Sequence, residues 1–345
     1  MTFAPKILNW YYEHQRNLPW RETRDPYKVW LSEIILQQTR VAQGMPYYLR
    51  FVEAFPTVHD LANAPEEQVL KLWQGLGYYS RARNLHATAK MVANDFDGEF
   101  PKTYKELKSL KGVGDYTASA IASFCFDVPE PVVDGNVYRV LSRYFGVDIP
   151  INSTQGIKYF KELAREVMDA ENIRDYNQGI MEFGAVQCAP KKPYCLLCPL
   201  QESCMALQEN KVDQLPVKLN KTKVRNRYFN YIVLLDDDGN TVLEQRRGKG
   251  IWQNLYQFPL IESEKQLQAK ELSPLIEQRD AVPKTTSLSL YNREPIVHKL
   301  SHQHLHTQFW ILKTSDILKE GTPWKEIGGF PVPVLIADFI KTLKI

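Results

Sequence analysis

Two carboxylates in this sequence have the surroundings that acid catalysis needs. Glu33 lies in the predicted helix 26–39, where its neighbours one turn away are mostly apolar. Burial raises the pKa of a carboxyl group, and a raised pKa suits a general acid near neutral pH. Asp134 closes an apolar run and precedes another predicted helix, where an aspartate is a common N-cap. A capping carboxylate is held still, and one of its oxygens can still face a cleft.

Together the two carboxylates suit the cleavage of a glycosidic bond. One carboxylic acid protonates the leaving group, and an ionised carboxylate stabilises the oxocarbenium-like transition state. Each residue also has a purely structural interpretation, Glu33 as a glutamate at the rim of a core helix with a basic partner and Asp134 as a helix cap. We expect the pair to share one site.

Four of the five cysteines crowd into residues 188–204, as Cys188, Cys195, Cys198 and Cys204. Prolines turn the short intervals between them, so four thiolates can reach one centre. Four soft ligands fit zinc or a 4Fe-4S cluster. Zinc sites more often use two C-x-x-C knuckles, and this run has one, so the spacing favours the cluster. Its expected role is structural. Lys191 and Lys192 in the same loop either meet phosphates or are simply solvated.

Two glycines separate two apolar helical stretches at residues 110–117, a pattern similar to a helix-hairpin-helix. Gly112 and Gly114 allow the backbone to turn tightly and to approach a ligand. The N–H groups at the start of the next helix favour an anion, for which we expect a DNA phosphate. A simple turn is the alternative.

The elements that must position these residues fall into two domains. Helical periodicity runs from residue 5 to about 210 and predicts an all-α domain over 1–210. Residues 211–227 are basic and lack periodicity, which predicts a solvated linker. Residues 228–345 predict an α+β domain with a small sheet, opened by a hairpin of 228–235 with 241–245 and closed by a helix within 331–343.

Bulk composition narrows the function classes. The chain has 345 residues, 44% of them hydrophobic, and a formal net charge of only +3, so any DNA surface must be a local patch. No apolar leader or membrane-spanning run is visible. We therefore expect a cytoplasmic protein without a membrane partner. A monomer is the default expectation.

With these residues assembled, the chain resembles the MutY adenine-DNA glycosylases of the helix-hairpin-helix superfamily over nearly its whole length. The motifs lie, in order, at 18–21, 32–39, 75–79, 110–117, 134–137, 182–185 and at the four cysteines. The resemblance implies a six-helix barrel with an iron-sulfur cluster module, followed by a Nudix-like domain. It implies duplex DNA as the partner, with adenine opposite 8-oxoguanine or guanine.

The resemblance also implies roles for single residues. Glu33 would protonate adenine at N7, and Asp134 would stabilise or covalently trap the sugar cation before water completes hydrolysis. Gln38 and Tyr78 would enter the DNA stack near the oxidised guanine. Such wedging side chains can offset the few kcal/mol that extruding the adenine costs. The adenine pocket would be lined by Arg21 and Glu182.

Tyr116 distinguishes two subclasses within the superfamily. In the related endonuclease III family, the matching hairpin position is a lysine that attacks the sugar and nicks the strand. A phenol cannot form that Schiff base. The resemblance therefore implies a monofunctional glycosylase, with Tyr116 in the catalytic site.

The second domain carries its own resemblance at residues 244–259, to the Nudix-like domain that MutY proteins use to recognise 8-oxoguanine. No R-E-x-x-E-E run follows to bind Mg²⁺, so we do not expect nucleotide hydrolysis. Leu300, Ser301 and His302 stand where the family has Phe-Ser-His. The leucine removes an aromatic contact but leaves the donors of Ser301 and His302. His302, His304 and His306 alternate, so a metal site on one strand face is also conceivable.

Two rival functions remain at this point. One is a related glycosylase for a different mismatch, such as thymine opposite guanine, and the other is a non-catalytic iron-sulfur DNA-binding protein. The second domain argues against the first rival. The pairing of Glu33 with Asp134 argues against the second, because phosphate binding alone does not require it.

Overall fold

The computed structural model describes residues 3–219, 224–278, 287–318 and 320–343. The chain divides into two compact units, and each contains two stretches of sequence. The first unit is Met1–Asn63 with Asn84–Asn220. The second is Ala64–Arg83 with Lys221–Ile345. Among the described residues, no helix combines the length and the apolar character that crossing a membrane requires.

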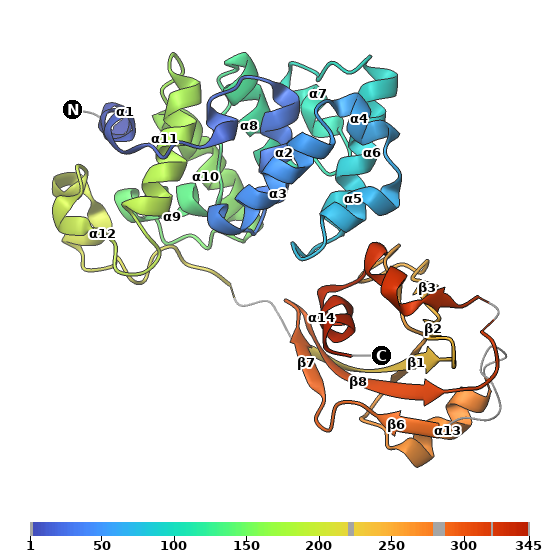
Figure 1. The fold of residues 1–345 in the computed structure, drawn as a ribbon. Coiled ribbons are helices and arrows are strands. Elements are labelled where there is room, and N and C mark those ends of the chain that lie inside the picture. Colours follow the sequence, from blue (N-terminus) through green and yellow to red (C-terminus); the bar gives the residue numbers. More distant parts are fainter. Residues whose placement is uncertain (1–2, 220–223, 279–286, 319, 344–345) are drawn as a thin grey trace. The chain divides into compact units, whose positions relative to one another are not determined.

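The first unit is helical (Figure 1). Its main helices are α1 (Phe3–His14), α2 (Pro26–Leu36), α3 (Val41–Ala54), α4 (Val58–Asn63), α7 (Tyr104–Ser109), α8 (Asp115–Phe126), α9 (Gly135–Phe145), α10 (Thr154–Val167), α11 (Ile173–Val186) and α12 (Met205–Gln208), with α6 (Ser80–Asp95) beginning in the second unit. Short 3-10 turns lie at η1 (Pro19–Arg21), η2 (Cys195–Leu197) and η3 (Gln201–Ser203).

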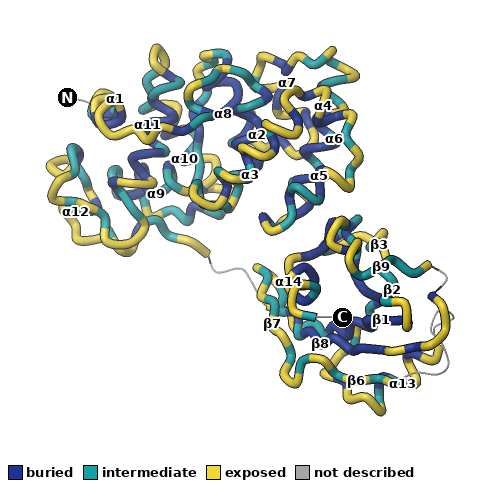
Figure 2. Tube along the Cα trace, in the orientation of Figure 1, coloured by how far each residue is buried: buried dark blue, intermediate teal, exposed yellow. Residues whose placement is uncertain are grey.

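Apolar residues of α1, α9, α10 and α11 form one buried core, which includes Ile7, Val137, Phe160 and Ile180. Figure 2 shows these helices as largely buried along their inner faces. Gly184 permits a close approach between two helices of this core. A Cβ atom on Gly184 would lie 2.7 Å from the Cβ of Asn136, so α11 can press against the first turn of α9 only because this position lacks a side chain.

The second unit contains a five-stranded sheet in which two long strands run parallel (Figure 1). They are β1 (Arg225–Leu235) and β8 (Gln303–Lys313). Antiparallel neighbours are β5 (Leu260–Ser263) on β1 and β6 (Ser287–Leu290) and β7 (Ile296–Lys299) on β8. Two-residue ladders pair β2 (Asn240–Thr241) with β9 (Thr322–Pro323) and β3 (Glu244–Gln245) with β4 (Tyr256–Gln257). The helical elements are α5 (Glu66–Leu72), α13 (Ala269–Glu277), α14 (Val334–Thr342) and η4 (Trp324–Gly329).

The predicted opening hairpin of this unit is wrong. β1 pairs with β8 and β5, and the next strand, β2, pairs with β9. Asp236 explains the difference, because its carboxylate accepts bonds from the backbone N–H groups of Asp238 and Asn240, at 3.1 and 2.7 Å. The turn is wrapped around this side chain, and the chain leaves without returning along β1. The predicted closing helix is confirmed as α14.

Candidate active site

Helix α2 holds Glu33 in the interior of the first unit. The helix begins with Asp25 as N-cap, whose carboxylate accepts from the Tyr27 backbone N–H at 3.0 Å, and with Pro26 in its first turn. Glu33 is only 7% exposed. Burial raises its pKa to about 7, and nearby Asp134 adds to the rise. The Tyr116 hydroxyl donates to Glu33 Oε2 at 2.6 Å and opposes the rise.

Asp134 is the N-cap of α9, as its position in the sequence predicts. Its Oδ1 accepts from the backbone N–H groups of Asn136 and Val137, each at 2.8 Å, and its Oδ2 accepts from Asn136 Nδ2 at 2.7 Å. Burial raises the pKa of Asp134, and these N–H donors oppose that rise. Because these three hydrogen bonds to its oxygens all come from N–H donors, the site is built to solvate a carboxylate anion.

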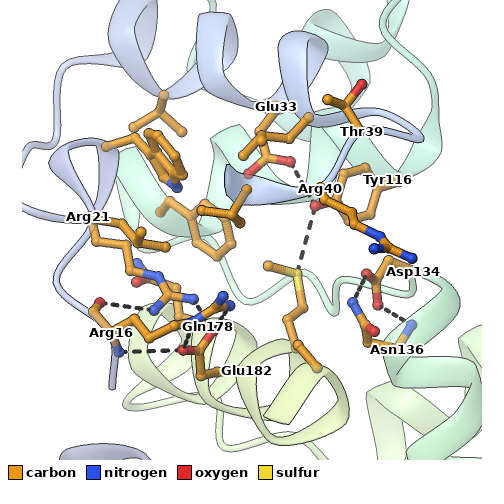
Figure 3. A pocket seen from close by; sticks show the side chains of 18 of the residues that line it. Arg16, Arg21, Glu33, Thr39, Arg40, Tyr116, Asp134, Asn136, Gln178 and Glu182 are labelled. Carbon is orange, nitrogen blue, oxygen red and sulfur yellow. Dashed lines mark hydrogen bonds and ion pairs between the residues drawn. The ribbon is translucent and has the colours of Figure 1, made fainter. Parts of the chain in front are cut away.

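One cavity of about 600 Å³ in the first unit is lined by both carboxylates and by Tyr116. Figure 3 shows Glu33 and Tyr116 together, with Asp134 and its partner Asn136 beside them. Tyr116 also lies 3.6 Å from the sulfur of Met181, another lining residue. Two carboxyl groups that come from distant parts of the sequence therefore face the same space.

A cluster of polar residues forms another wall of this cavity (Figure 3). Glu182 is 1% exposed and is bound by Arg16 Nε at 2.5 Å and by Arg21 NH2 at 2.8 Å. Burial would raise the pKa of Glu182, but the two arginines outweigh it and hold that pKa below its usual value. Gln178 lines the same wall and accepts from Tyr11 at 2.9 Å.

The sequence prediction did not include Arg16 and Gln178. Gln178 stands four residues before Glu182 on α11, so helical spacing alone puts both on one face. That spacing was a usable signal. Arg16 lies in the connection between α1 and η1, for which no periodicity exists, and only its contact with Glu182 reveals it.

The predicted hairpin borders the same part of the first unit. Gly112 has φ of 77°, in the left-handed region, and a Cβ there would lie 2.7 Å from Asn84 Cβ. Gly114 is the N-cap of α8. Both glycines, with Gln38, line a cavity of about 520 Å³ that also includes Glu33, Tyr116 and Asp134. The structure thus brings the hairpin and the carboxylates to one contiguous region.

The four clustered cysteines line one small cavity beside Arg143. None is in a disulfide, and Arg143 NH1 lies 3.5 Å from Cys188 Sγ. Burial, with repulsion from the neighbouring thiols, raises the pKa of Cys198 to about 12. Across the described ranges, no three Cys, His, Asp or Glu side chains converge as ligands of a single ion. Four cysteines that line one cavity match the donor set of a 4Fe-4S cluster.

Arg139 connects this cysteine loop to the capped end of α9. Its Nε donates to the Cys188 carbonyl at 2.8 Å, and its NH2 donates to Asn136 Oδ1 at 2.9 Å. Asn136 in turn holds Asp134. Three hydrogen bonds, through the side chains of Arg139 and Asn136, therefore connect the loop backbone with the Asp134 carboxylate.

The remaining predicted residues gather in the second unit. Tyr78 is 48% exposed and shares a hydrogen bond with the Ser301 hydroxyl. Tyr78, Leu300, Ser301 and His302 all line a cavity of about 600 Å³, with the aromatic rings of Tyr79 and Trp252 among its walls. The predicted site residues thus form three groups: the carboxylate cavities and the cysteine cavity in the first unit, and this cavity in the second.

The alternating histidines do not form the conceivable metal site. His306 stacks on Tyr228, with ring centroids 4.9 Å apart, and its Nε2 lies 3.3 Å from Asn226 Oδ1. No metal-binding group that includes these residues is found where the chain is described. The imidazole of His306 instead stacks on the Tyr228 ring and lies beside the Asn226 amide.

Comparison with known proteins identifies both regions of the chain. Residues 31–166 match the HhH-GPD superfamily base excision DNA repair protein family, and residues 230–342 match the NUDIX domain family. The adenine DNA glycosylase of Buchnera aphidicola subsp. Baizongia pistaciae (strain Bp) is 35% identical over 344 residues, which is 97% of this chain and 95% of that protein. The adenine DNA glycosylase of Homo sapiens is 42% identical over 62% of this chain and 41% of that protein.

Solved structures resemble the helical part. A thermostable thymine-DNA glycosylase has a TM-score of 0.56 and 33% identity, over 60% of this chain and 95% of that one. A non-covalent endonuclease III–DNA complex has a TM-score of 0.53 and 23% identity, over 60% and 94%, and shows the fold alone. The predicted fold class, a mainly α region followed by an α+β Nudix-like domain, is confirmed.

Proposed function

Because this chain belongs to the adenine DNA glycosylase family, we propose that it removes adenine paired with 8-oxoguanine or guanine from duplex DNA. The observation that carries the proposal is the cavity in which Glu33 and Asp134 meet. A carboxyl group with a pKa of about 7 is protonated in much of the population at neutral pH. The second carboxylate is held by N–H donors.

These two groups account for each step of base release. Glu33 gives its proton to N7 of the extruded adenine, and the bond between N9 and C1′ breaks with its electron pair passing to the base. Asp134 stabilises the cation left on the sugar, through its charge or through a transient bond to C1′. Water then adds its hydroxyl to C1′ and returns a proton to Glu33.

The polar wall formed by Gln178 and Glu182 supports a purine specificity. Glu182 stays ionised between Arg16 and Arg21, so it offers fixed acceptor oxygens in the cavity. The adenine amino group is a donor and its ring nitrogens are acceptors, which a carboxylate and an amide can match. An extruded base needs such partners because its Watson–Crick edge has lost its pairing.

Tyr116 supports a monofunctional enzyme. Its hydroxyl is bound to Glu33, and burial raises its pKa well above the usual value, so it stays neutral. A neutral phenol forms no Schiff base with the sugar. Its contribution is to hold the Glu33 carboxyl at the cavity.

Cys188, Cys195, Cys198 and Cys204 would hold a 4Fe-4S cluster, which supplies structural crosslinking of the 188–204 loop. The Arg143 guanidinium lies 3.5 Å from the Cys188 sulfur. The same arginine donates to the Ala189 carbonyl at 2.8 Å, and Arg139 binds the Cys188 carbonyl. The loop would be fixed on α9 by these two arginines and by the cluster.

The second unit supports recognition of the base opposite the adenine. Ser301 and His302 supply donors and Tyr78 supplies a ring at one cavity. Oxidation of guanine at C8 adds a carbonyl acceptor and an N7–H donor, which polar side chains can distinguish from guanine. The helical part also resembles a thymine-DNA glycosylase, so its fold alone does not determine which mismatch is recognised. The contacts in the second unit would make that choice.

The test is single-turnover release of adenine from duplexes that hold adenine opposite 8-oxoguanine, guanine or thymine. The parent protein should cleave the first fastest, and Glu33→Gln should lose about 10²-fold or more in rate. Glu53→Gln, at an exposed position of α3, is the matched control and should keep the parent rate. Equal rates for Glu33→Gln and the parent would place the acid elsewhere. No adenine release from any duplex would reject the proposed function.

A further inference from the structure

The segment Ala64–Arg83 lies between two stretches of the first unit in sequence, but its contacts make it part of the second unit. It carries α5 and the loop 75–79, whose last residues are Tyr78 and Tyr79. Tyr78 is the residue of this loop that meets Ser301. The position of the loop therefore depends on what holds α5.

Both ends of the segment are bound to residues 253–256. Glu66 accepts from Asn254 Nδ2 at 2.6 Å, and Glu67 accepts from the Tyr256 hydroxyl at 2.5 Å. At the other end, Arg83 donates to the Gln253 carbonyl at 2.9 Å. These contacts restrain the segment at its two ends but leave its middle to other groups.

Lys71 holds the middle. Its Nζ donates to the carbonyls of Gly328 and Phe330, at 2.6 and 3.0 Å, and to Gln74 Oε1 at 3.2 Å. An ammonium group has three N–H bonds, and each has one of these acceptors. The two carbonyls end the helical turn η4, where the backbone dipole favours a cation. A surface lysine in water has no such fixed set of partners.

Gln74 connects Lys71 with the loop 75–79. Its Oε1 also accepts from the Val332 backbone N–H, at 3.4 Å, and the loop begins at the next residue. Within the loop, Gly75, Gly77 and Tyr78 have φ of 102°, 73° and 46°, in the left-handed region. Arg81 NH2 donates to the carbonyls of residues 76 and 77, at 3.3 Å each. Trp73, the C-cap of α5, donates from its Nε1 to the Gly77 carbonyl at 3.0 Å, so the loop is also bound to the end of α5.

We propose that Lys71 is a positioning residue that determines how strongly this protein prefers 8-oxoguanine over guanine opposite the adenine. It fixes α5 and the loop 75–79 on residues 328–332, and so places Tyr78 against Ser301. The inference rests on the proposed function. The three acceptors of Lys71 are not among the residues that line the Glu33 cavity, so we expect its loss to spare bond cleavage itself.

The test compares Lys71→Met with Lys71→Arg and with Lys90→Met, which removes an exposed lysine of α6. Single-turnover rates are measured on adenine opposite 8-oxoguanine and opposite guanine. Lys71→Met should reduce the ratio of the two rates by about 5- to 30-fold, because three hydrogen bonds that orient the loop are lost. Lys71→Arg should recover most of the ratio, and Lys90→Met should keep it.

Amide hydrogen exchange on the full chain provides the second measurement. Residues 74–79 should exchange faster in Lys71→Met than in the parent, while residues 115–126 should be unchanged. An unaltered rate ratio, or an equal fall on both duplexes, would overturn the positioning role. A parent protein without any preference would instead reject the proposed recognition of 8-oxoguanine, so the two failures are distinguishable.

Discussion

Burial raises the pKa of Glu33 and so makes it an acid near neutral pH, and the Tyr116 hydroxyl limits that rise. Taking Glu33 out of water raises its pKa, whereas the Tyr116 hydroxyl favours the ionised form. The two effects leave the pKa at about 7, where the group can both give and regain a proton. A carboxyl buried without this donor would hold its proton too tightly to release it readily.

The pH dependence follows from this balance. Below pH 7 Glu33 is protonated, so the single-turnover rate should be high there and should fall as the pH rises through about 7. Tyr116→Phe removes a donor to the ionised form, so the pKa of Glu33 rises and the falling limb should move up by about one pH unit. Single-turnover rates between pH 5.5 and 9 measure the falling limb of the parent protein and that of Tyr116→Phe. A limb that stays in place, or moves down, would contradict this account.

Residue types and spacing predicted the centre of the site but not its rim. Glu33 and Asp134 could be found because a carboxylate among apolar neighbours and one before a helix are local patterns. The bond from Tyr116 to Glu33 joins residues 83 apart in sequence, and no local pattern contains it. Arg16 was missed for the same reason, since its function is set by a glutamate on another helix.

At the scale of elements, α9 and α11 meet at Gly184. Gly184→Ala places a methyl group 2.7 Å from Asn136 Cβ and 2.8 Å from its carbonyl oxygen, so the helices must separate or shift. We expect a loss of about 1–3 kcal/mol in the free energy of unfolding. Because Asn136 holds Asp134, base release should slow as well. Thermal denaturation and single-turnover rates measure the two effects.

Gly248→Ala is the control for that variant. A Cβ at Gly248 meets no heavy atom within 4 Å, and the residue has no positive φ. It should leave stability and rate close to the parent values. If Gly184→Ala were as stable and as fast as this control, the close contact between α9 and α11 would not constrain the site.

Helices could be predicted from the sequence because their periodicity is local. Strand pairing could not be predicted in this way. The start of α2 follows from Asp25 and Pro26, which are readable in order, whereas the helix ends at Leu36, before the predicted end at residue 39. The partner of β1 lies about 80 residues later, at β8, and both strands are buried over most of their length. Nothing near residue 240 distinguishes a returning hairpin from a turn wrapped on Asp236, so the nearer partner was wrongly preferred.

At the scale of the whole molecule, the cysteine loop yields a chemical prediction. The purified protein should contain four iron atoms and four acid-labile sulfides per chain, since four thiolates surround one cavity. Cys198→Ser should lower this content and the temperature of unfolding, because the loop 188–204 loses its crosslink. Metal analysis and calorimetry check both results. Zinc at one ion per chain would contradict the cluster and restore the alternative left open by the spacing.

The division of the sequence between the two units limits how related chains can recombine. The chain passes from one unit to the other at residues 63/64, 83/84 and 220/221, so no single cut separates them. Recombination that exchanges only residues after 220 would graft a foreign surface onto a native Ala64–Arg83. Such a chimera would have to match Lys71 with carbonyls from another lineage. Residues 64–83 and 221–345 should therefore be transplanted together, as one module encoded in two pieces.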